Sequence, residues 1–197
     1  MGERGQRVLD LVICVSITPV LAVVLPVALA VAWWDTRSPL FVQPRLGRDC
    51  REFNLFKIRT MRKGTPSVGS HEVPSGMISR TGQLLRRLKV DELPQVWNVL
   101  KGDMSLVGPR PCLPKQVDVI RARRERDCFR VRPGITGAAQ IARVDMSQPE
   151  RLAEYDAKML DQLTLWSYLG YLVQTACGRG RGDAASTTCE TGRRSVA

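Results

Sequence analysis

The amino-acid sequence predicts an α/β chain, mainly helical with a few short strands, in which a membrane helix precedes one compact domain. Leu11 to Trp34 is a 24-residue apolar run without a charged residue. Several later segments repeat apolar residues at helical spacing, whereas Phe53–Met61 shows the period of two typical of a strand. The 197 residues leave room for one ordinary domain. We therefore expect a membrane helix in residues 1–36, a compact domain in residues 37–176, and a disordered tail in residues 177–197, which are rich in Gly, Arg, Ser and Thr.

Composition narrows the possible partners and chemistries. The net charge of +11 indicates a polyanionic partner, which is a nucleic acid, an anionic membrane surface or a phosphorylated substrate. The six cysteines form no C-x-x-C pair and no zinc-like spacing, which is typical of a reducing compartment. His71 is the only histidine and lies in a Gly/Ser/Pro-rich segment, so histidine-centred catalysis is disfavoured.

The apolar run is long enough to reach across a bilayer. A straight helix over it would be ~36 Å long, against a hydrocarbon core of ~30 Å. It is too long for the apolar region of a signal peptide. Pro19 and Pro26 each remove a hydrogen bond, so the helix has two places to bend, and Ser16 and Thr18 are near enough to bond part of the backbone freed by Pro19. Basic flanking residues tend to stay in the cytoplasm, and both flanks of the run are basic. A re-entrant hairpin would keep both flanks in the cytoplasm, whereas a spanning helix would keep only one there. The sequence leaves both topologies open.

The segment after the membrane helix combines turns with one strand. Residues 38–47 are predicted to be turn-rich. In the following strand, Lys57 and Arg59 share one face, so two cations face one anionic site. The alternative is a basic edge strand whose charges discourage pairing. Residues 63–77 are rich in Gly, Ser and Pro and are predicted to form a mobile loop that covers a site.

Two further segments bring arginines toward the centre of the sequence. Residues 79–89 resemble a short helix with leucines on one side and cations on the other, which places Arg86 next to Asp91. Residues 102–111 are too rich in Gly and Pro for a simple helix. Pro109 and Pro111 hold Arg110 in a fixed direction, as an anion clamp requires.

Between these segments, Asp91 and Glu92 form an adjacent pair of carboxylates at the start of a predicted helix. Pro94 suits the first helical turn, apolar residues recur at helical spacing from Leu93, and Gly102 is a C-cap. Acidic residues are common in any first helical turn, where they cap free N–H groups. On the residues alone, the pair is either a helix cap or a functional dyad.

The C-terminal half is predicted to be helical and basic. Residues 115–130 form a basic amphipathic helix, whose charged face is solvated or rests on anionic lipid. Residues 132–140 form a glycine-bearing turn, and a last helical stretch runs from 151 to 175.

Five segments in order resemble one protein family. They are the apolar run with Thr18–Pro19, Phe56-Lys57-Ile58-Arg59-Thr60-Met61, the stretch from Asp91 to Ser105, Val107-Gly108-Pro109-Arg110-Pro111, and Arg132-Pro133-Gly134-Ile135-Thr136-Gly137. Together they resemble the bacterial sugar transferases, the monotopic phosphoglycosyl transferases, in their minimal form. The resemblance covers residues 8–175.

The resemblance implies a membrane enzyme that moves a sugar phosphate from a UDP-sugar to a polyprenyl phosphate, usually undecaprenyl phosphate, and releases UMP. It implies Asp91 as the nucleophile, Glu92 as its partner in binding Mg²⁺, and a re-entrant membrane helix broken at a Ser-Pro pair, here Thr18–Pro19. It also implies the bacterial inner membrane with the catalytic domain facing the cytoplasm, in the first membrane step of surface glycan synthesis. We assign substrate binding to Lys57, Arg59, Arg86, Arg110, Arg132 and Gln140.

Elementary chemistry points the same way, and two alternatives compete with it. A carboxylate that attacks a nucleotide diphosphate needs cations to neutralise the phosphates, and these segments supply them. Tyr168 stands where the family typically has Asp, so a catalytically inactive scaffold is one alternative. A membrane-anchored basic module that binds nucleic acid or anionic lipid is the other, but the arginine cluster carries few aromatic residues, so no nucleic-acid partner is expected.

Overall fold

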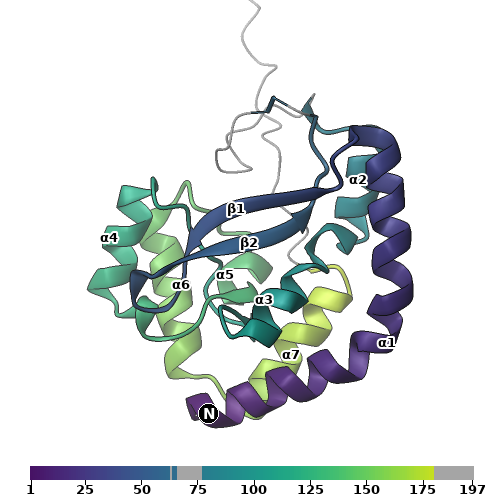
Figure 1. Cartoon of the computed structure of the whole chain (residues 1–197). Helices are drawn as coiled ribbons and strands as arrows, with labels where there is room; N and C mark the ends of the chain where they lie inside the picture. Colours follow the sequence, from purple (N-terminus) through teal and green to yellow (C-terminus); the bar gives the residue numbers. More distant parts are fainter. Residues whose placement is uncertain (63, 66–76, 180–197) are drawn as a thin grey trace, which may run out of the picture.

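The computed structural model describes residues 1–62, 64–65 and 77–179. The described residues form a mainly helical fold with two small pairs of strands, as the sequence predicts (Figure 1). Most of the expected mobile loop at 63–77 and most of the expected tail at 177–197 lie outside the described residues.

The apolar run lies within one long helix, α1 (Glu3–Thr36), which contains Pro19 and Pro26. The helix is long and apolar enough to cross a membrane. Figure 1 shows that it changes direction along its length, so that its first half runs beneath the domain and its second half runs up one side. Proline is a common cause of such a bend, because it removes a hydrogen bond from the helix. The Ser16 hydroxyl donates to the Val12 carbonyl and the Thr18 hydroxyl to the Cys14 carbonyl, each at 2.8 Å. Neither donates to the Val15 carbonyl, whose helical donor is missing at Pro19, so that expectation was wrong.

The first half of α1 is bonded to the domain by polar side chains. Arg7 donates to the Val99 carbonyl at the end of helix α3 (Gln95–Lys101). Asp10 is buried, and its Oδ1 accepts hydrogen bonds from the Leu106 amide at 2.9 Å and from the Tyr168 hydroxyl at 2.5 Å. The departure from the family pattern at Tyr168 therefore supplies a buried polar contact with α1.

The second half of α1 packs against the same domain through small residues. Ala28 and Ala32 are buried with Ile58 and Leu85. Leu85 belongs to α2 (Arg80–Arg87), which confirms the helix predicted at 79–89 with slightly shorter bounds; Ser79 is its N-cap. Both halves of α1 thus contact one body.

A hairpin of two antiparallel strands crosses the top of the domain in Figure 1. It consists of β1 (Leu40–Leu46) and β2 (Glu52–Ile58), joined through a 3₁₀ turn at Arg48–Cys50. The prediction of a turn-rich segment at 38–47 was wrong, because most of it is β1. Pro44 suggested a turn, but a proline is tolerated in a two-stranded sheet, where each strand has a free edge.

The predicted helix after Asp91 is confirmed as α3. A 3₁₀ turn at Val90–Glu92 precedes it, Pro94 is its N-cap residue, and Gly102 ends it with a φ of 98°, which favours glycine. The chain continues into β3 (Ser105–Val107), which pairs in parallel with β4 (Gly134–Thr136), and then α5 (Ala138–Ile141) follows.

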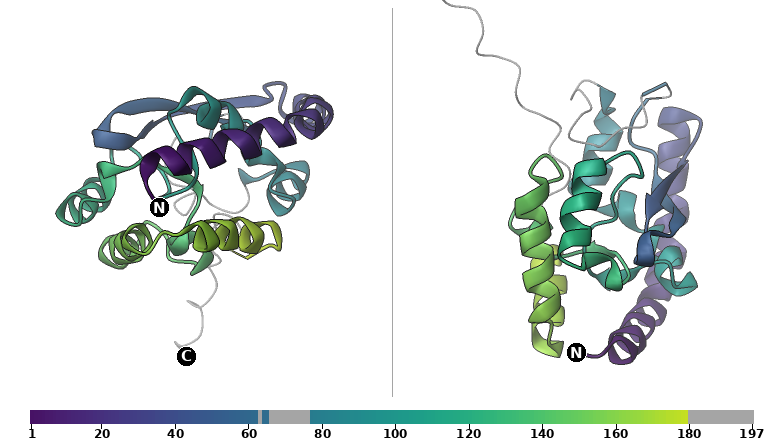
Figure 2. Two further views of the ribbon diagram at one scale, coloured as in Figure 1. Left: turned by 90° about the horizontal axis from the view of Figure 1, so that it is seen from below. Right: turned by 90° about the vertical axis from the view of Figure 1, so that its left-hand side faces the viewer.

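The C-terminal helices differ from the prediction in two ways. The basic helix is only α4 (Val117–Glu125), because Asp127 adopts a left-handed conformation and a 3₁₀ turn follows at Cys128–Arg130. The last helical stretch is two helices, α6 (Pro149–Asp161) and α7 (Leu165–Ala176), because Thr164 caps the second one. Figure 2 shows α4 and α6 side by side.

The arginines of the expected basic face are largely paired within the chain. Arg123 is buried and donates to Asp156 Oδ2 at 2.7 Å. Arg126 and Arg130 contact Glu150 and Asp161. Because of these pairings, the segment does not present a continuous cationic face to a nucleic acid.

Candidate functional site

The two central carboxylates lie where α2, α3 and β2 meet. Asp91 is 8% exposed and sits with Glu92 in the 3₁₀ turn before α3. Because Pro94 is the N-cap residue of α3 and no side chain from the described residues caps this helix, the structure does not support the capping interpretation. Lys89, just before the turn, adopts a φ of 56°, which is uncommon for a residue with a side chain. Such strain is found at functional sites more often than elsewhere.

Two cations from different elements meet at Glu92. Lys57 Nζ of β2 lies 3.2 Å from Glu92 Oε1, and Arg110 Nη2 lies 3.0 Å from the same oxygen. The three side chains are largely buried, so this contact is less screened by water than a surface ion pair. The structure thus brings two of the cations that the sequence analysis assigned to substrate binding to Glu92, and that role stays a prediction.

The loop that carries Arg110 is fixed by two buried arginines. Arg123 Nη1 donates to the Arg110 carbonyl at 2.7 Å, and Arg45 Nη1 donates to the Pro111 carbonyl at 3.0 Å. On the other side, the Gly134 amide donates to the Pro109 carbonyl at 2.9 Å. A Cβ at position 134 would come within 2.0 Å of the Gly108 nitrogen, so only glycine allows this approach. Arg110 is therefore held in a defined direction, as its flanking prolines suggested.

Lys89 joins the site to the end of α7. Its Nζ donates to the carbonyls of Thr175 and Arg179, at 3.0 and 3.1 Å. Carbonyls at a helix C-terminus carry partial negative charge and attract a cation. Burial lowers the pKa of Lys89, while the nearby Glu92 carboxylate opposes this shift.

Arg59 and Arg86 lie near the site but bond to other groups. Arg59 donates to the Ser38 carbonyl at 3.1 Å and stacks over the Phe41 ring. Phe41 is opposite Lys57 in the hairpin, so Arg59 and Lys57 lie on one face as predicted. Arg86 donates to the Thr60 hydroxyl at 2.8 Å. These hydrogen bonds of Arg59 and Arg86 are therefore made outside the Lys57–Glu92–Arg110 cluster.

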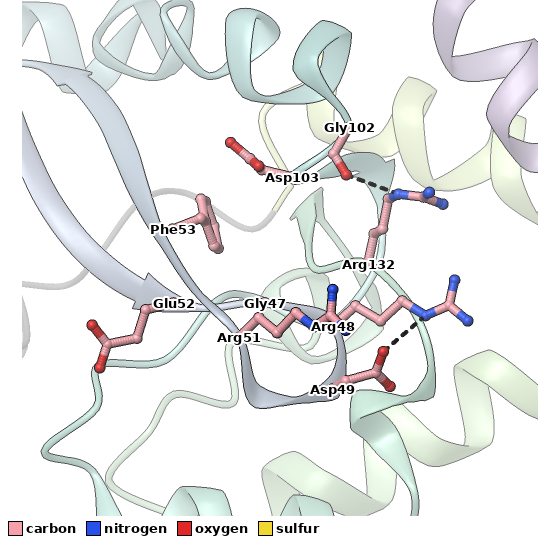
Figure 3. A pocket seen from close by; sticks show the side chains of 9 residues that line it. All are labelled: Gly47, Arg48, Asp49, Arg51, Glu52, Phe53, Gly102, Asp103 and Arg132. Atoms are coloured by element: carbon pink, nitrogen blue, oxygen red, sulfur yellow. Dashed lines mark hydrogen bonds and ion pairs between the residues drawn. The ribbon is translucent and has the colours of Figure 1, made fainter.

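Arg132 lies in a separate polar pocket of about 420 Å³, shown in Figure 3. Its Nε donates to the Gly102 carbonyl at 2.9 Å, and its Nη1 contacts Glu3 at 2.7 Å. Gly102 ends α3, whereas Glu92 precedes that helix, so the pocket lies at the opposite end of α3, ~10 Å along its axis. Asp49, Glu52 and Asp103 also line the pocket, so its arginines are balanced by acidic groups.

Gln140 is held in the first turn after β4. Its Nε2 donates to the Ile135 carbonyl at 2.8 Å, and its Oε1 is buried without a hydrogen-bond partner in the described part of the chain. The structure does not bring Gln140 into contact with the Lys57–Glu92–Arg110 cluster.

Two positioning residues escaped the sequence analysis. Asn98 of α3 is fully buried; its Oδ1 accepts from the Phe56 amide at 3.1 Å and its Nδ2 donates to the Asn54 carbonyl at 2.7 Å. It therefore closes the outer edge of β2 and fixes Lys57 relative to α3. Arg45 was missed because its segment was interpreted as turns. Gln43 and Arg45 are two residues apart, a spacing that places both side chains on one face of a strand, and the Gln43 Oε1 accepts a hydrogen bond from Arg45. That spacing was the only sequence signal for the role of Arg45.

The dyad is compatible with Mg²⁺. Adjacent carboxylates supply hard oxygen donors, and Mg²⁺ sites commonly use one or two carboxylates together with substrate phosphates. Among the described residues there is no group of three or more His, Cys, Asp or Glu side chains that suits a metal ion. A site with Asp91 and Glu92 would therefore need oxygen ligands from a bound substrate or from water.

Known proteins with similar sequences are described as sugar transferases or as enzymes that transfer a sugar phosphate. The family model for "Bacterial sugar transferase" matches residues 1–179. The "uncharacterized sugar transferase EpsL" of Bacillus subtilis is 37% identical over 83% of this chain and 79% of its own length.

Two relatives carry names that state a reaction. The "UDP-glucose:undecaprenyl-phosphate glucose-1-phosphate transferase" of Caulobacter vibrioides is 37% identical over 84% of this chain. The "UDP-N-acetylgalactosamine-undecaprenyl-phosphate N-acetylgalactosaminephosphotransferase" of Aeromonas hydrophila is 33% identical over 83% of this chain. The matched regions span 64% and 40% of these relatives. The extent of these matches shows that the chain belongs to the bacterial sugar transferase family.

Proposed function

We propose that this protein transfers a sugar phosphate from a UDP-sugar to undecaprenyl phosphate or a similar polyprenyl phosphate, with release of UMP, as the first membrane step of surface glycan synthesis. The observation that carries the proposal is the convergence of Lys57 and Arg110 on Glu92, beside the buried Asp91 and next to an apolar helix. The names of the relatives support the two substrates.

In the first half-reaction, Asp91 attacks the phosphorus that carries the sugar. The bond from that phosphorus to the oxygen bridging the two phosphates breaks, and UMP leaves with the bridging oxygen. The sugar phosphate is then covalently bound to the Asp91 carboxylate. Lys57 and Arg110 lie where they can neutralise charge on the phosphates, and Mg²⁺ bound by Asp91 and Glu92 would add to that neutralisation.

In the second half-reaction, an oxygen of the polyprenyl phosphate attacks the same phosphorus. The bond to Asp91 breaks, which restores the carboxylate and produces a polyprenyl diphosphate sugar. One site thus serves a soluble donor and a lipid acceptor in turn, and ping-pong kinetics follow.

We also propose that α1 enters and leaves the bilayer on the same, cytoplasmic, side. Supporting this, Arg7 and Asp10 in its first half and Ala28 and Ala32 in its second half all contact the same domain. In a spanning helix, these two sets would be separated by the thickness of the hydrocarbon core.

The covalent intermediate provides the test. The purified protein is incubated with Mg²⁺ and a UDP-sugar labelled at the sugar-bearing phosphate, without lipid; we expect labelled protein and about one UMP per active site. Asp91→Asn should abolish both because it removes the nucleophile. Asp118→Asn, at an exposed surface ion pair, is the matched control and should behave as the wild type. Continued UMP release by Asp91→Asn would refute the assigned nucleophile, and the same assay with EDTA tests the need for Mg²⁺.

A further inference from the structure

The 3₁₀ turn at Val90–Glu92, which carries both central carboxylates, is held only weakly by its own backbone. The Glu92 amide donates to the Lys89 carbonyl at 3.4 Å. The Leu93 amide donates to the Val90 carbonyl at 3.2 Å, whereas a strong N–H···O bond measures about 2.9–3.0 Å. A single helical turn is marginal by itself, because fixing its backbone costs more free energy than one such bond returns. The direction of this turn must therefore be set by contacts with other elements.

Lys89 ties the start of this turn to the end of α7. Lys89 is the N-cap residue of the turn, and its Nζ donates to the carbonyls of Thr175 and Arg179 at 3.0 and 3.1 Å. Val90 also packs against the buried cluster at the second half of α1, but an apolar contact lacks the directionality of a hydrogen bond. Glycine would adopt the left-handed backbone of Lys89 more readily, so the Lys89 side chain supplies a contact that a glycine could not make.

The end of α7 that accepts these hydrogen bonds is itself firmly built. Gly178 adopts a φ of 85°, and the Arg179 amide donates to the Gln174 carbonyl at 2.9 Å. The Gly178 amide donates to the Thr175 carbonyl at 3.1 Å, which completes the pattern of a Schellman C-cap. The hydroxyls of Thr175 and Thr136 are hydrogen-bonded at 2.5 Å, which joins this helix end to β4. The α7 terminus is therefore a fixed support for the ammonium group.

We propose that Lys89 is a positioning residue: by tying the turn to the C-terminal end of α7, it holds the Asp91 carboxylate in the direction that attack on phosphorus requires. This inference rests on the proposed function. A misplacement of ~1 Å can slow a reaction about 100-fold, so this support acts on the rate of attack and not on the affinity for the UDP-sugar. The competing interpretation is that Lys89 leaves the α7 carbonyls and binds the diphosphate itself.

The test compares the rate of the first half-reaction with its dependence on donor concentration. Lys89→Met removes the ammonium group, Lys89→Arg keeps a cationic donor, and Lys158→Met makes the first change at an exposed position of α6. Single-turnover UMP release is measured against UDP-sugar concentration. We expect the maximal rate of Lys89→Met to fall roughly tenfold or more, while the half-saturating concentration stays within about twofold of the wild type. Lys89→Arg should recover most of the rate, and Lys158→Met should match the wild type.

Lys89→Gly separates the side chain from the backbone of the same residue. Glycine suits the left-handed conformation, so this variant should be no less resistant to denaturant than Lys89→Met. It should nevertheless release UMP as slowly as Lys89→Met, because neither variant can bond the α7 carbonyls. A wild-type rate in Lys89→Gly would overturn the proposal.

Amide hydrogen exchange makes the test independent of turnover. Loss of the Lys89 ammonium should speed exchange in the last turn of α7, residues 173–179, relative to Lys158→Met, because the helix end loses a donor to its terminal carbonyls. Exchange in the rest of the domain should stay as in the wild type, which shows that Lys89→Met is folded. Equal exchange of residues 173–179 in Lys89→Met and Lys158→Met would refute the tether.

The kinetic outcomes also separate this proposal from the proposed function. An unchanged maximal rate in Lys89→Met would overturn the positioning role. A rise of roughly tenfold in the half-saturating concentration would do the same, whatever the maximal rate, because Lys89 would then bind the donor directly. Failure of the wild type to release UMP and form the labelled intermediate would overturn the proposed function instead.

Discussion

Asn98 shows how one buried amide positions a site that it does not touch. It satisfies a donor and an acceptor on the free edge of β2, the strand that carries Lys57, and its backbone carbonyl also accepts from the Gly102 and Asp103 amides. Without it, the edge of a two-stranded sheet would be buried against α3 with unpaired groups, which is costly.

Replacement of this amide should therefore weaken both the fold and the first half-reaction. We expect Asn98→Ala to lower the free energy of unfolding by about 1–3 kcal/mol, because two partly buried main-chain groups lose their partners. UMP release should slow as Lys57 loses its fixed position. Denaturant unfolding and single-turnover UMP release measure the two effects.

The neighbouring Asn54 gives the control for this prediction. Its side chain is exposed, so Asn54→Ala should change the stability by less than about 0.5 kcal/mol. If Asn98→Ala were as stable as Asn54→Ala, the edge-closing role would be wrong.

Single residues of the site were predictable only where local chemistry and motif agreed. Lys57, Arg110 and the Asp91–Glu92 pair were chosen because charge, spacing and flanking prolines all marked them, and the structure brings Lys57 and Arg110 to Glu92. Arg132 and Gln140 were chosen from a glycine-rich turn, and the structure places them away from Glu92. Whether a residue of this turn lies near Glu92 or away from it depends on how β4 packs against β3 and on where α3 ends. No local sequence pattern predicts either of these.

Among the elements, α1 differs most from an ordinary membrane helix. It presents small or polar residues to the domain near both ends and valines to the outside between them. Its direction changes partway along its length (Figure 1), and Pro19 and Pro26 both lie inside it. Pro19 removes one backbone hydrogen bond from the helix. We expect this loss to allow the bend by which both halves of α1 contact the same domain.

Restoring that hydrogen bond should change the topology. With a cysteine introduced by Gly5→Cys and the exposed Cys177 replaced by Ser, an impermeant thiol reagent should label position 5 only after the cells are permeabilised. Adding Pro19→Ala should straighten the helix and increase labelling of intact cells, with a parallel loss of activity.

Pro26→Ala is the matched comparison, because it restores the equivalent bond closer to the second end. Strong labelling of Gly5→Cys in intact cells without any further change would contradict a helix with both ends on one side.

At the level of elements, helices were easier to predict than strands. Helices at 79–89 and 93–101 follow from apolar spacing and cap residues. Strand β1 was missed because Pro44 and the preceding Ser38–Pro39 look like turns, and only its pairing with β2 makes it a strand. The break between α6 and α7 depends on one cap residue, Thr164, within an otherwise helical pattern.

For the whole molecule, cysteine reactivity tests how the parts are packed. Cys112 and Cys128 are buried between the hairpin and the C-terminal helices, whereas Cys177 is exposed. Burial raises the pKa of Cys128 to about 11 and also raises that of Cys112. At pH 8 roughly one Cys128 thiol in a thousand is then a reactive thiolate.

Maleimide at pH 8 should therefore label Cys177 within the time in which Cys112 and Cys128 remain unmodified. Because unfolding returns both pKa values toward about 8.5, all three should react at similar rates in denaturant. Peptide mass spectrometry measures each site separately. Equal rates for Cys128 and Cys177 in the native protein would contradict this packing.

The general architecture followed from composition, since an apolar run and helical periodicity predict a membrane helix and a mainly helical domain. The way in which the helix packs against the domain could not be predicted from composition. It depends on Asp10 and Tyr168, which bond across 158 positions of sequence, and neither residue signals its partner by any local pattern.

That bond also sets an order of events during synthesis. Asp10 precedes its partner Tyr168 by 158 positions, so Tyr168 emerges only after most of the described domain has been translated. The Asp10 carboxylate of α1 therefore lacks its Tyr168 partner until α7 has been made. Contacts between distant parts of a chain form slowly, because the intervening loop must first close. Docking of α1 on the domain thus depends on α7, and chains that stop before α7 should leave the first half of α1 undocked.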